Sequence, residues 1–384
     1  MRVGIITSSY PRTAEDSHDA GVFVRDFARK LSKEQVDVAV ITPQKVIQHA
    51  DPFRVRSFPW PGAETSLTHV DPRNLLNRAR LAILLGSGII ACLRAFRALR
   101  IEHALAMWAI PSGAQAWVAR KLLGTPYSVW ALGSDIWNIG DYPLGRPILR
   151  RILRGAEHLY ADGTELSAEV ERISGRPCIF LPTSRELPAP VENGVTHLAA
   201  DRVHLLCVAR FHPNKGVDVL IDAVSLLPER TRRQMQFHIF GGGPQEGALR
   251  AKIAHNRLTD CMILGGYVER EDLVRYLRSV RCLVIPSRIE SIPLVLSDAA
   301  QVGCPVIATD VGDVGRLVKR FRMGLVVPPG SPRALATALG AVVADEMPFD
   351  PTGAALLASE LSLDSSVKRF LDDITRTDAR SALE

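Results

Sequence analysis

The stretch IPSRIESIPLVLSDAA, residues 285–300, decides how the second half of this chain folds. It begins at the end of an apolar run from Cys282 to Ile285, turns around Glu290, and continues as a helix from Leu294. A short buried strand followed by a turn and a helix is the repeating unit of a parallel sheet covered by helices. Carboxylates accept hydrogen bonds from vicinal hydroxyls, so Glu290 and Asp298 lining one wall would suit a sugar.

The same rhythm of strands and helices extends in both directions from this stretch. In the second half the predicted strands are His204–Val208, Gln236–Phe240, Met262–Leu264, Cys282–Ile285, Val306–Thr309 and Leu325–Val327. In the first half they are Val3–Ser8, Val36–Thr42, Arg54–Phe58, His103–Trp108, Tyr127–Leu132, His158–Ala161 and Cys178–Leu181, with helices at Val22–Ser32, Pro72–Leu99, Ser112–Leu123 and Thr164–Ile173. The sequence therefore predicts an α/β chain with two doubly wound parallel sheets and a ligand cleft at the strand ends.

A proline-rich stretch separates the two halves. Residues 182 to 200 contain three prolines and no periodicity, and we place a linker at 184–200. The first domain is then 1–183 and the second 201–348, consistent with the two domains that 384 residues favour. Residues 349–384 follow the last strand, and their helix, within Ser365 to Thr377, could cross back to the first domain.

Two cations follow the first strand of the second domain. Arg210 ends that strand, and Lys215-Gly216 opens the next helix at Val217. Cations and free backbone N–H groups aimed at one point can hold a diphosphate. Glycines at Gly241 and Gly242 end the next strand, where backbone can approach a ligand closely.

Composition and the absence of several common motifs exclude several classes of protein. The net charge is +6, hydrophobic residues make up 47%, and the six cysteines form no C-x-x-C pair. No P-loop, nucleophile elbow, zincin motif or dinucleotide fingerprint is present. Asp16, His18 and Asp19 share one loop, which we interpret as solvated rather than as a metal site.

No export signal follows Met1, so we expect a cytoplasmic chain. The apolar run Leu81 to Leu93 is shorter than the roughly 20 residues of a membrane span, and predicts a buried helix, with an interfacial helix as the alternative. Arginines at 146, 150, 151 and 154 lie at helical spacing and indicate either a solvated face or contact with anionic headgroups.

The ordered motifs R-x-x-x-x-K-G, G-G-G-P, P-S-R-x-E, G-x-P-V-I-A-T-D and G-L-V-V-P-P together resemble the family 4 retaining glycosyltransferases. That family has the GT-B fold, in which two Rossmann-like domains face a cleft. The resemblance covers nearly all of the second domain. Asp298 stands where the family has a second glutamate, and Leu132 stands where it has a histidine.

The resemblance implies a role for each matching residue. Arg210 and Lys215 would neutralise the donor diphosphate, Glu290 would face the donor sugar, and Asp298 would reach the ribose. The implied donor-binding residues are Gly21, Gly241, Gly242, Val268, Ser287, Ile292, Pro293, Leu294 and Asp298. On the acceptor side it implies Asp135, with His18 as a stand-in for the missing histidine, although a surface histidine is the simpler interpretation.

These implications predict a retaining, hexosyl-type transfer from a nucleotide-diphosphate sugar to an acceptor hydroxyl in polysaccharide or glycolipid synthesis. The partners would be the donor and a carbohydrate or lipid-linked acceptor, with peripheral contact at the inner face of a membrane, no nucleic acid, and neither metal nor cofactor. A non-catalytic GT-B scaffold that binds a partner or lipid is the alternative. A dinucleotide oxidoreductase is a weaker one, since the fingerprint glycines are absent.

Overall fold

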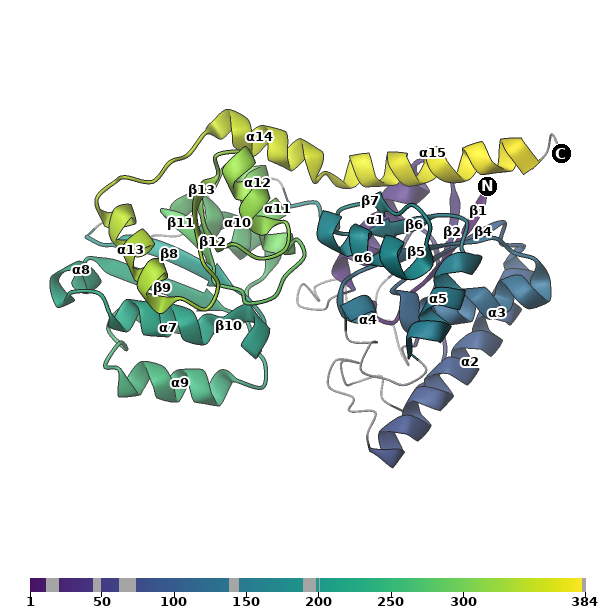
Figure 1. The fold of residues 1–384 in the computed structure, drawn as a ribbon, viewed down its shortest axis with the longest axis horizontal. Helices are drawn as coiled ribbons and strands as arrows, with labels where there is room; N and C mark the ends of the chain where they lie inside the picture. The colour runs from purple at the N-terminus through teal and green to yellow at the C-terminus, as the bar shows by residue number, and fades with distance from the viewer. Residues whose placement is uncertain are drawn as a thin grey trace. The chain divides into compact units, whose positions relative to one another are not determined.

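The computed structural model describes residues 1–11, 21–43, 50–61, 74–137, 145–188, 198–199 and 201–381. They form two compact units, Met1–Thr183 with Leu363–Glu384, and Ser184–Ser362 (Figure 1). Each unit is built around its own parallel sheet. The predicted α/β class with two parallel sheets is confirmed.

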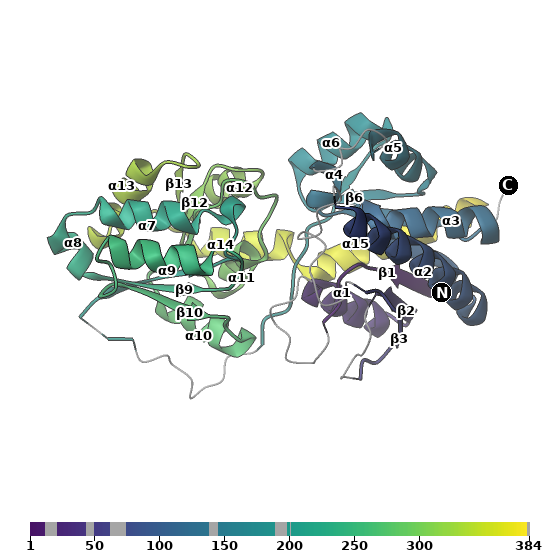
Figure 2. The same ribbon diagram turned by 90° about the horizontal axis from the view of Figure 1, so that it is seen from below.

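The sheet of the first unit has seven strands in the order β3-β2-β1-β4-β5-β6-β7. The strands are β1 (Arg2–Ile6), β2 (Asp37–Thr42), β3 (Arg54–Ser57), β4 (His103–Met107), β5 (Tyr127–Ala131), β6 (Leu159–Ala161) and β7 (Ile179–Phe180). The helices are α1 (Val22–Lys33), α2 (Leu75–Leu99), a helical turn η2 (Ala109–Gly113), α3 (Ala114–Leu123), α4 (Ser134–Trp137), α5 (Gly145–Gly155), α6 (Thr164–Ser174) and α15 (Leu363–Ser381). Helix α2 packs on α3, and α1 packs on α15 (Figure 2).

The sheet of the second unit has six strands in the order β10-β9-β8-β11-β12-β13. The strands are β8 (Val203–Val208), β9 (Met235–Phe240), β10 (Met262–Gly266), β11 (Cys282–Ile285), β12 (Val306–Thr309) and β13 (Gly324–Val327). The helices are η4 (Pro213–Lys215), α7 (Val217–Ser225), α8 (Glu229–Arg233), α9 (Glu246–His255), α10 (Arg270–Ser279), α11 (Leu294–Val302), α12 (Val314–Arg320), α13 (Pro332–Val343) and α14 (Pro351–Glu360). Helix α7 packs with α9 and α13, and α11 with α10 and α14 (Figure 1).

Every strand expected from the sequence is present, with ends that differ by at most a few residues. The central strands are short and apolar because helices cover both faces of a parallel sheet, and this leaves little ambiguity in their identification. In both sheets the first strand lies between the second and the fourth, so the chain reverses its winding direction there. Ligands bind at such a reversal, outside the carboxyl ends of the strands.

The C-terminal residues divide between the two units. Helix α14 belongs to the second unit, and α15 belongs to the first, where Phe370 is fully buried. The Phe370 ring makes edge contacts with the rings of Phe27, His103 and Tyr160. The hydroxyl of Ser366 also donates to the carbonyl of Pro182 at 3.0 Å. These contacts fasten α15 to the first unit.

Helix α2 is longer than its apolar run suggested. It spans 25 residues and, of the helices that the structure describes, is the one long and apolar enough to cross a membrane by length and composition. The prediction of a buried helix is right for one face alone, since Leu84, Gly88, Cys92 and Phe96 are buried and Ile83 is exposed. The helix predicted at Pro72–Leu99 is thus present, and the expectation that it does not span a membrane stays a prediction.

The basic helix and the cysteines lie as the composition suggested. On α5, Arg146, Arg150 and Arg151 are exposed while Leu149 and Ile152 are buried, which fits both the solvated face and the contact with anionic headgroups. The six cysteines are free thiols, five of them buried and Cys178 half-buried. Burial raises the pKa of the Cys92, Cys207 and Cys304 thiols.

Candidate functional site

The reversal of the second sheet lies between β8 and β11. Two loops leave the carboxyl ends of these strands, residues 209–216 and residues 286–293. Arg210, Lys215, Ser287, Glu290 and Ile292, which the sequence singled out, all lie on these two loops. The fold therefore gathers at one sheet edge the residues that are up to 82 positions apart in the chain.

An ion pair joins the two loops. The ammonium of Lys215 donates to Oε2 of Glu290, and the side chains are 20% and 13% exposed. The hydroxyl of Ser287 lies 3.4 Å from the same oxygen. A lysine ammonium has three donors, so Lys215 can hold Glu290 and still donate to an anion. The arrangement thus places a cation and an orienting carboxylate side by side at the reversal.

Backbone contacts bring the two loops together. Gly216 has φ +66°, and a Cβ there would lie 1.9 Å from the carbonyl oxygen of Pro286. Only glycine satisfies both this conformation and this approach. The carbonyl of Asn214 accepts from the Arg288 backbone N–H at 2.7 Å. The Arg288 guanidinium also binds both carboxylate oxygens of Asp218 on α7, each at 2.7 Å.

The strand on the other side of β11 supports the Glu290 loop. The hydroxyl of Thr309, at the end of β12, donates to the carbonyl of Ser287 at 2.5 Å. Gly312 approaches so closely that a Cβ would lie 2.2 Å from the carbonyl oxygen of Glu290. The backbone that carries Glu290 is therefore held from both neighbouring strands.

The glycines after β9 serve a similar packing purpose. A Cβ on Gly241, at φ +140°, would lie 1.9 Å from the carbonyl oxygen of Ala209, and Gly242 accepts from the N–H of Phe211 at 2.8 Å. Gly242 also lies against the ring of Tyr267, the residue that precedes Val268 in the chain. These close approaches explain the glycines structurally, and their role in donor binding stays a prediction.

Helix α11 begins beside Glu290. Its N-cap is Pro293, which makes no side-chain cap, so no N-cap side chain accepts from the first backbone N–H groups of the helix, which begin at Leu294. The hydroxyl of Ser291 is buried and has no hydrogen-bond partner among the residues that the structure describes. Arg210, two residues after the end of β8, is exposed. The loop edge thus offers backbone and side-chain donors of the kind that bind anions.

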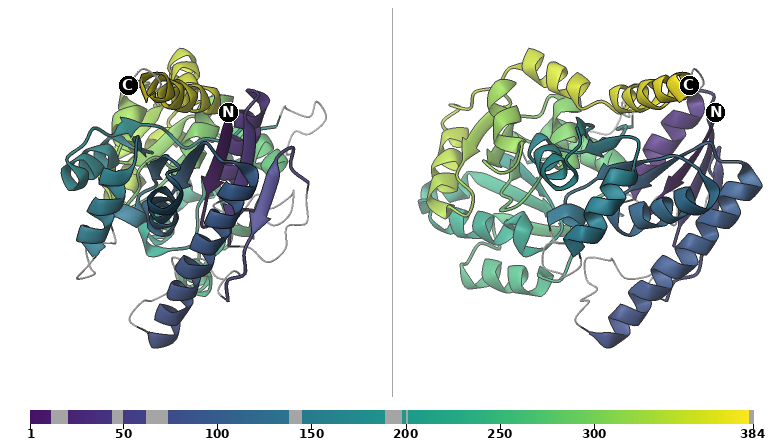
Figure 3. Two further views of the ribbon diagram at one scale, coloured as in Figure 1. Left: turned by 90° about the vertical axis from the view of Figure 1, so that its right-hand side faces the viewer. Right: turned by 45° about the vertical axis from the view of Figure 1, so that its right-hand side comes forward.

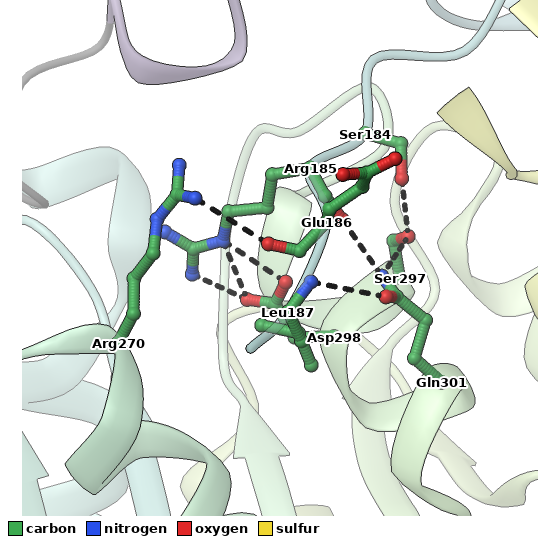
Figure 4. A network of polar contacts seen from close by, with 8 residues as sticks. All are labelled: Ser184, Arg185, Glu186, Leu187, Arg270, Ser297, Asp298 and Gln301. Atoms are coloured by element: carbon green, nitrogen blue, oxygen red, sulfur yellow. Dashed lines mark hydrogen bonds and ion pairs between the residues drawn. The ribbon is translucent and has the colours of Figure 1, made fainter. Parts of the chain in front are cut away.

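Asp298, on α11, has its side chain in a buried contact. Its carboxylate is fully buried and accepts from Nε of Arg185 at 3.0 and 3.2 Å and also from the terminal guanidinium nitrogen (Figure 4). A carboxylate with this partner presents no exposed oxygen to a ribose. The ribose role of Asp298 stays a prediction, and it requires Arg185 to share or release the carboxylate.

Arg185 belongs to a buried polar network that ties the predicted linker to α11. Ser184 and Ser297 share a hydrogen bond of 2.9 Å between their hydroxyls. The amide of Gln301 donates to the carbonyl of Arg185 at 3.0 Å (Figure 4). Ser184, the first residue of the predicted linker, therefore packs on the second unit.

The first unit contains two of the predicted residues. Gly21 lies so close to Tyr10 that a Cβ would be 2.5 Å from its Cα and N. Asp135 is buried and accepts from the N–H groups of Ala109 at 2.5 Å and Leu132 at 3.1 Å. Burial raises the pKa of Asp135 to about 6, although these hydrogen bonds act in the opposite direction. Asp135 therefore joins the loops after β4 and β5. His18 lies outside the described residues.

Three residues of the site region were not identified from the sequence. Arg185 has its partner 113 positions away, Arg288 binds a helix 70 positions away, and nothing local distinguishes Ser291. Of these three residues, the sequence pointed to Arg288 alone, as the arginine of the P-S-R-x-E motif. In the part of the chain that the structure describes, no group of three His, Cys, Asp or Glu could hold a metal ion.

The second unit matches a family of known proteins. Residues 202–345 match the family model described as Glycosyl transferases group 1. The chain is 26% identical to a Bacillus subtilis protein over 88% of each chain. That protein is named as a teichuronic acid biosynthesis glycosyltransferase. It is 30% identical over 194 residues to D-inositol 3-phosphate glycosyltransferase of Jonesia denitrificans, a match that covers 49% of this chain and 43% of that protein. The matches to this relative and to an Erwinia amylovora glycosyltransferase span less than half of those relatives' lengths.

Solved structures agree on the fold. Sucrose-phosphate synthase from Thermosynechococcus elongatus has a TM-score of 0.73 at 20% identity, covering 100% of this chain and 99% of that one. HepE of Anabaena, in complex with UDP-glucose, has a TM-score of 0.70 at 15% identity, covering 97% and 99%. The relatives are named as glycosyltransferases, which favours the transferase prediction over the non-catalytic scaffold. The chain has the two-domain GT-B fold, and its residues 202–345 are similar to the glycosyl transferases of group 1.

Proposed function

We propose that this protein transfers a hexosyl group from a nucleotide-diphosphate sugar to an acceptor hydroxyl, with retention at the anomeric carbon, in polysaccharide or glycolipid synthesis. The observation that carries the proposal is the Lys215–Glu290 ion pair at the reversal of the second sheet. The named activities of the relatives and the UDP-glucose in the HepE structure support the choice of donor class.

In the proposed reaction, the bond between the sugar carbon and the diphosphate oxygen breaks while the acceptor oxygen bonds to that carbon. The acceptor proton leaves with the released nucleoside diphosphate or passes to solvent. Negative charge grows on the diphosphate as the bond breaks. Preorganised donors aimed at developing charge typically supply the largest part of catalysis. We assign this role to Arg210, to Lys215 and to the N-terminus of α11.

Glu290 would then orient the sugar through its hydroxyls, since a carboxylate accepts hydrogen bonds from them. The pair with Lys215 keeps both charged groups in place while the donor is absent. The buried Ser291 hydroxyl is a further donor available to the ligand. On this proposal the leaving charge is neutralised by side chains and backbone, and activity should survive a chelator of divalent metals.

We also propose that the enzyme works in the cytoplasm at the inner face of a membrane, on a carbohydrate or lipid-linked acceptor. The net charge of +6 supports contact with an anionic surface.

The test combines binding and turnover. Purified protein is screened by thermal shift against UDP-, GDP- and ADP-sugars, and the stabilising donor is used to measure hydrolysis and transfer. We expect stabilisation by one donor class and a loss of turnover of about a hundredfold or more in Lys215→Ala. Lys252→Ala is the matched control, because Lys252 also pairs with a carboxylate, Asp222, but on the surface between α7 and α9.

Stabilisation by none of the donors would count against the whole proposal. Wild-type turnover in Lys215→Ala, with a donor that does bind, would remove Lys215 from the reaction. Inversion at the anomeric carbon, read by NMR of the product, would overturn the proposed stereochemistry.

A further inference from the structure

Helix α2 exposes an apolar stripe along the face that points away from its own unit. Leu75, Leu76, Ile83 and Ile90 are 77%, 71%, 46% and 51% exposed. Ala79, Ala82 and Gly86 lie between them and are also exposed. Residues three or four apart share one helix face, so these side chains form a continuous strip. Continuous exposed apolar surface marks a site of interaction.

The opposite face of α2 belongs to the core of the first unit. Leu84, Cys92 and Phe96 are buried, and a Cβ on Gly88 would lie 2.0 Å from the Gln115 side chain on α3. Helix α2 also connects β3 to β4 within one sheet. Crossing a bilayer would pull this buried face out of the core and break the connection. The helix is therefore placed to lie along a surface rather than to span it.

The charges on α2 all have one sign. The helix carries Arg78, Arg80, Arg94 and Arg97, all exposed, and its sequence contains no acidic residue. The arginines flank the apolar strip at both ends of the helix. A helix that lies in a membrane interface has this pattern, because its apolar face enters the lipid while long basic side chains reach the headgroups. Each basic residue near an anionic surface contributes about 1 kcal/mol of attraction.

We propose that the α2 strip, defined as Leu75, Leu76, Ile83, Ile90 and the small residues between them, is the surface by which this protein docks on an anionic lipid membrane. The inference rests on the proposed location at a membrane, and it names the element that makes the contact. Figure 3 shows the N-terminal half of α2 extending beyond the other helices of its unit.

A second copy of the chain fits the strip less well. In a symmetric antiparallel pairing, Arg78 and Arg80 of one helix would face Arg94 and Arg97 of the other. Like charges brought together in this way are unfavourable, whereas anionic headgroups neutralise all four. The charge pattern thus selects a lipid surface over self-association.

The experiment measures flotation of the purified full-length chain with vesicles. One set contains equal parts of phosphatidylglycerol and phosphatidylcholine, and the other contains phosphatidylcholine alone. We expect binding to the anionic set that is at least about tenfold stronger, and loss of about tenfold or more in the double variant Ile83→Glu, Ile90→Glu. The variant Arg94→Gln, Arg97→Gln should lose the preference for anionic vesicles.

The control is Leu226→Glu, Leu356→Glu, which changes two exposed apolar residues of the second unit and should bind like the wild type. Unfolding temperatures should be unchanged in every variant, since all these positions are exposed. Vesicle binding that persists in Ile83→Glu, Ile90→Glu would overturn the proposal. A dimer seen by light scattering that this double variant abolishes, with no vesicle binding by the wild type, would also overturn it in favour of a second copy.

Donor hydrolysis in the absence of vesicles separates this inference from the proposed function. The double variant should hydrolyse the donor at the wild-type rate, because α2 lies outside the site residues. Hydrolysis without vesicle binding in the wild type would reject the docking surface alone. Vesicle binding without hydrolysis would reject the proposed reaction alone.

Discussion

Lys215 and Glu290 form an ion pair across the point where the second sheet reverses its winding. Each residue lies on a different loop, and the two are 75 positions apart in the chain, with three complete strands between them. The pair depends on how closely the two loops approach, and this approach is set by backbone contacts rather than by the charges. Changes to the backbone at this point should therefore affect the site as strongly as changes to its side chains.

Gly216→Ala should destabilise the protein by about 2–4 kcal/mol and reduce turnover. The positive φ costs about 1 kcal/mol for an L-residue, and the methyl group would also collide with the Pro286 carbonyl. Gly330→Ala is the matched control, since Gly330 has φ +65° with nothing within 4 Å of its Cβ position. It should cost about 1 kcal/mol. Denaturant unfolding measures both, and equal costs would refute the role of the loop contact.

Arg185→Ala should destabilise the second unit by about 3–5 kcal/mol, because it leaves the buried Asp298 carboxylate without its partner. Removing both side chains in Arg185→Ala, Asp298→Ala should recover much of that loss. Arg250→Ala breaks an exposed pair with Glu246 and should cost less than about 0.5 kcal/mol. A double-mutant cycle by denaturant unfolding gives the coupling energy, and additive effects would show that the pair is not coupled.

Ser291→Ala should leave stability unchanged or raise it by about 1 kcal/mol, since a buried hydroxyl without a partner is unfavourable. If the hydroxyl binds the donor, the same change raises KM for the donor several-fold. Ser297→Ala serves as the control, because that hydroxyl is hydrogen-bonded within the protein, and it should lower stability. Thermal unfolding and donor kinetics are measured on both variants. An unchanged KM in Ser291→Ala would exclude the donor contact.

Asp135 should make the first unit less stable as pH rises from about 4 to about 6. Its pKa is raised in the folded state, so its contribution is fully present below the unfolded pKa of about 3.8 and is lost through pH 6. The change amounts to about 2–3 kcal/mol. It is measured as the difference in unfolding free energy between wild type and Asp135→Asn across this pH range. A difference that does not vary with pH would contradict the raised pKa.

The sequence by itself determined the strands, the α/β class and the order of the loops that carry the site. It could do so because short apolar strands in parallel sheets leave a strong local pattern, and because glycines mark turns that other residues cannot make. Arg210, Lys215 and Glu290 were identified from their places between a predicted strand and the helix that follows it.

Only the tertiary structure decided which of those residues meet. Lys215 reaches Glu290 because β8 and β11 are neighbours, whereas Asp298, one helix further, turns inward to Arg185. Likewise, the apolar pattern of α2 could not reveal that one of its faces is exposed. Local sequence fixes the period of a segment, but its partners lie many positions away, and burial depends on what those distant segments cover.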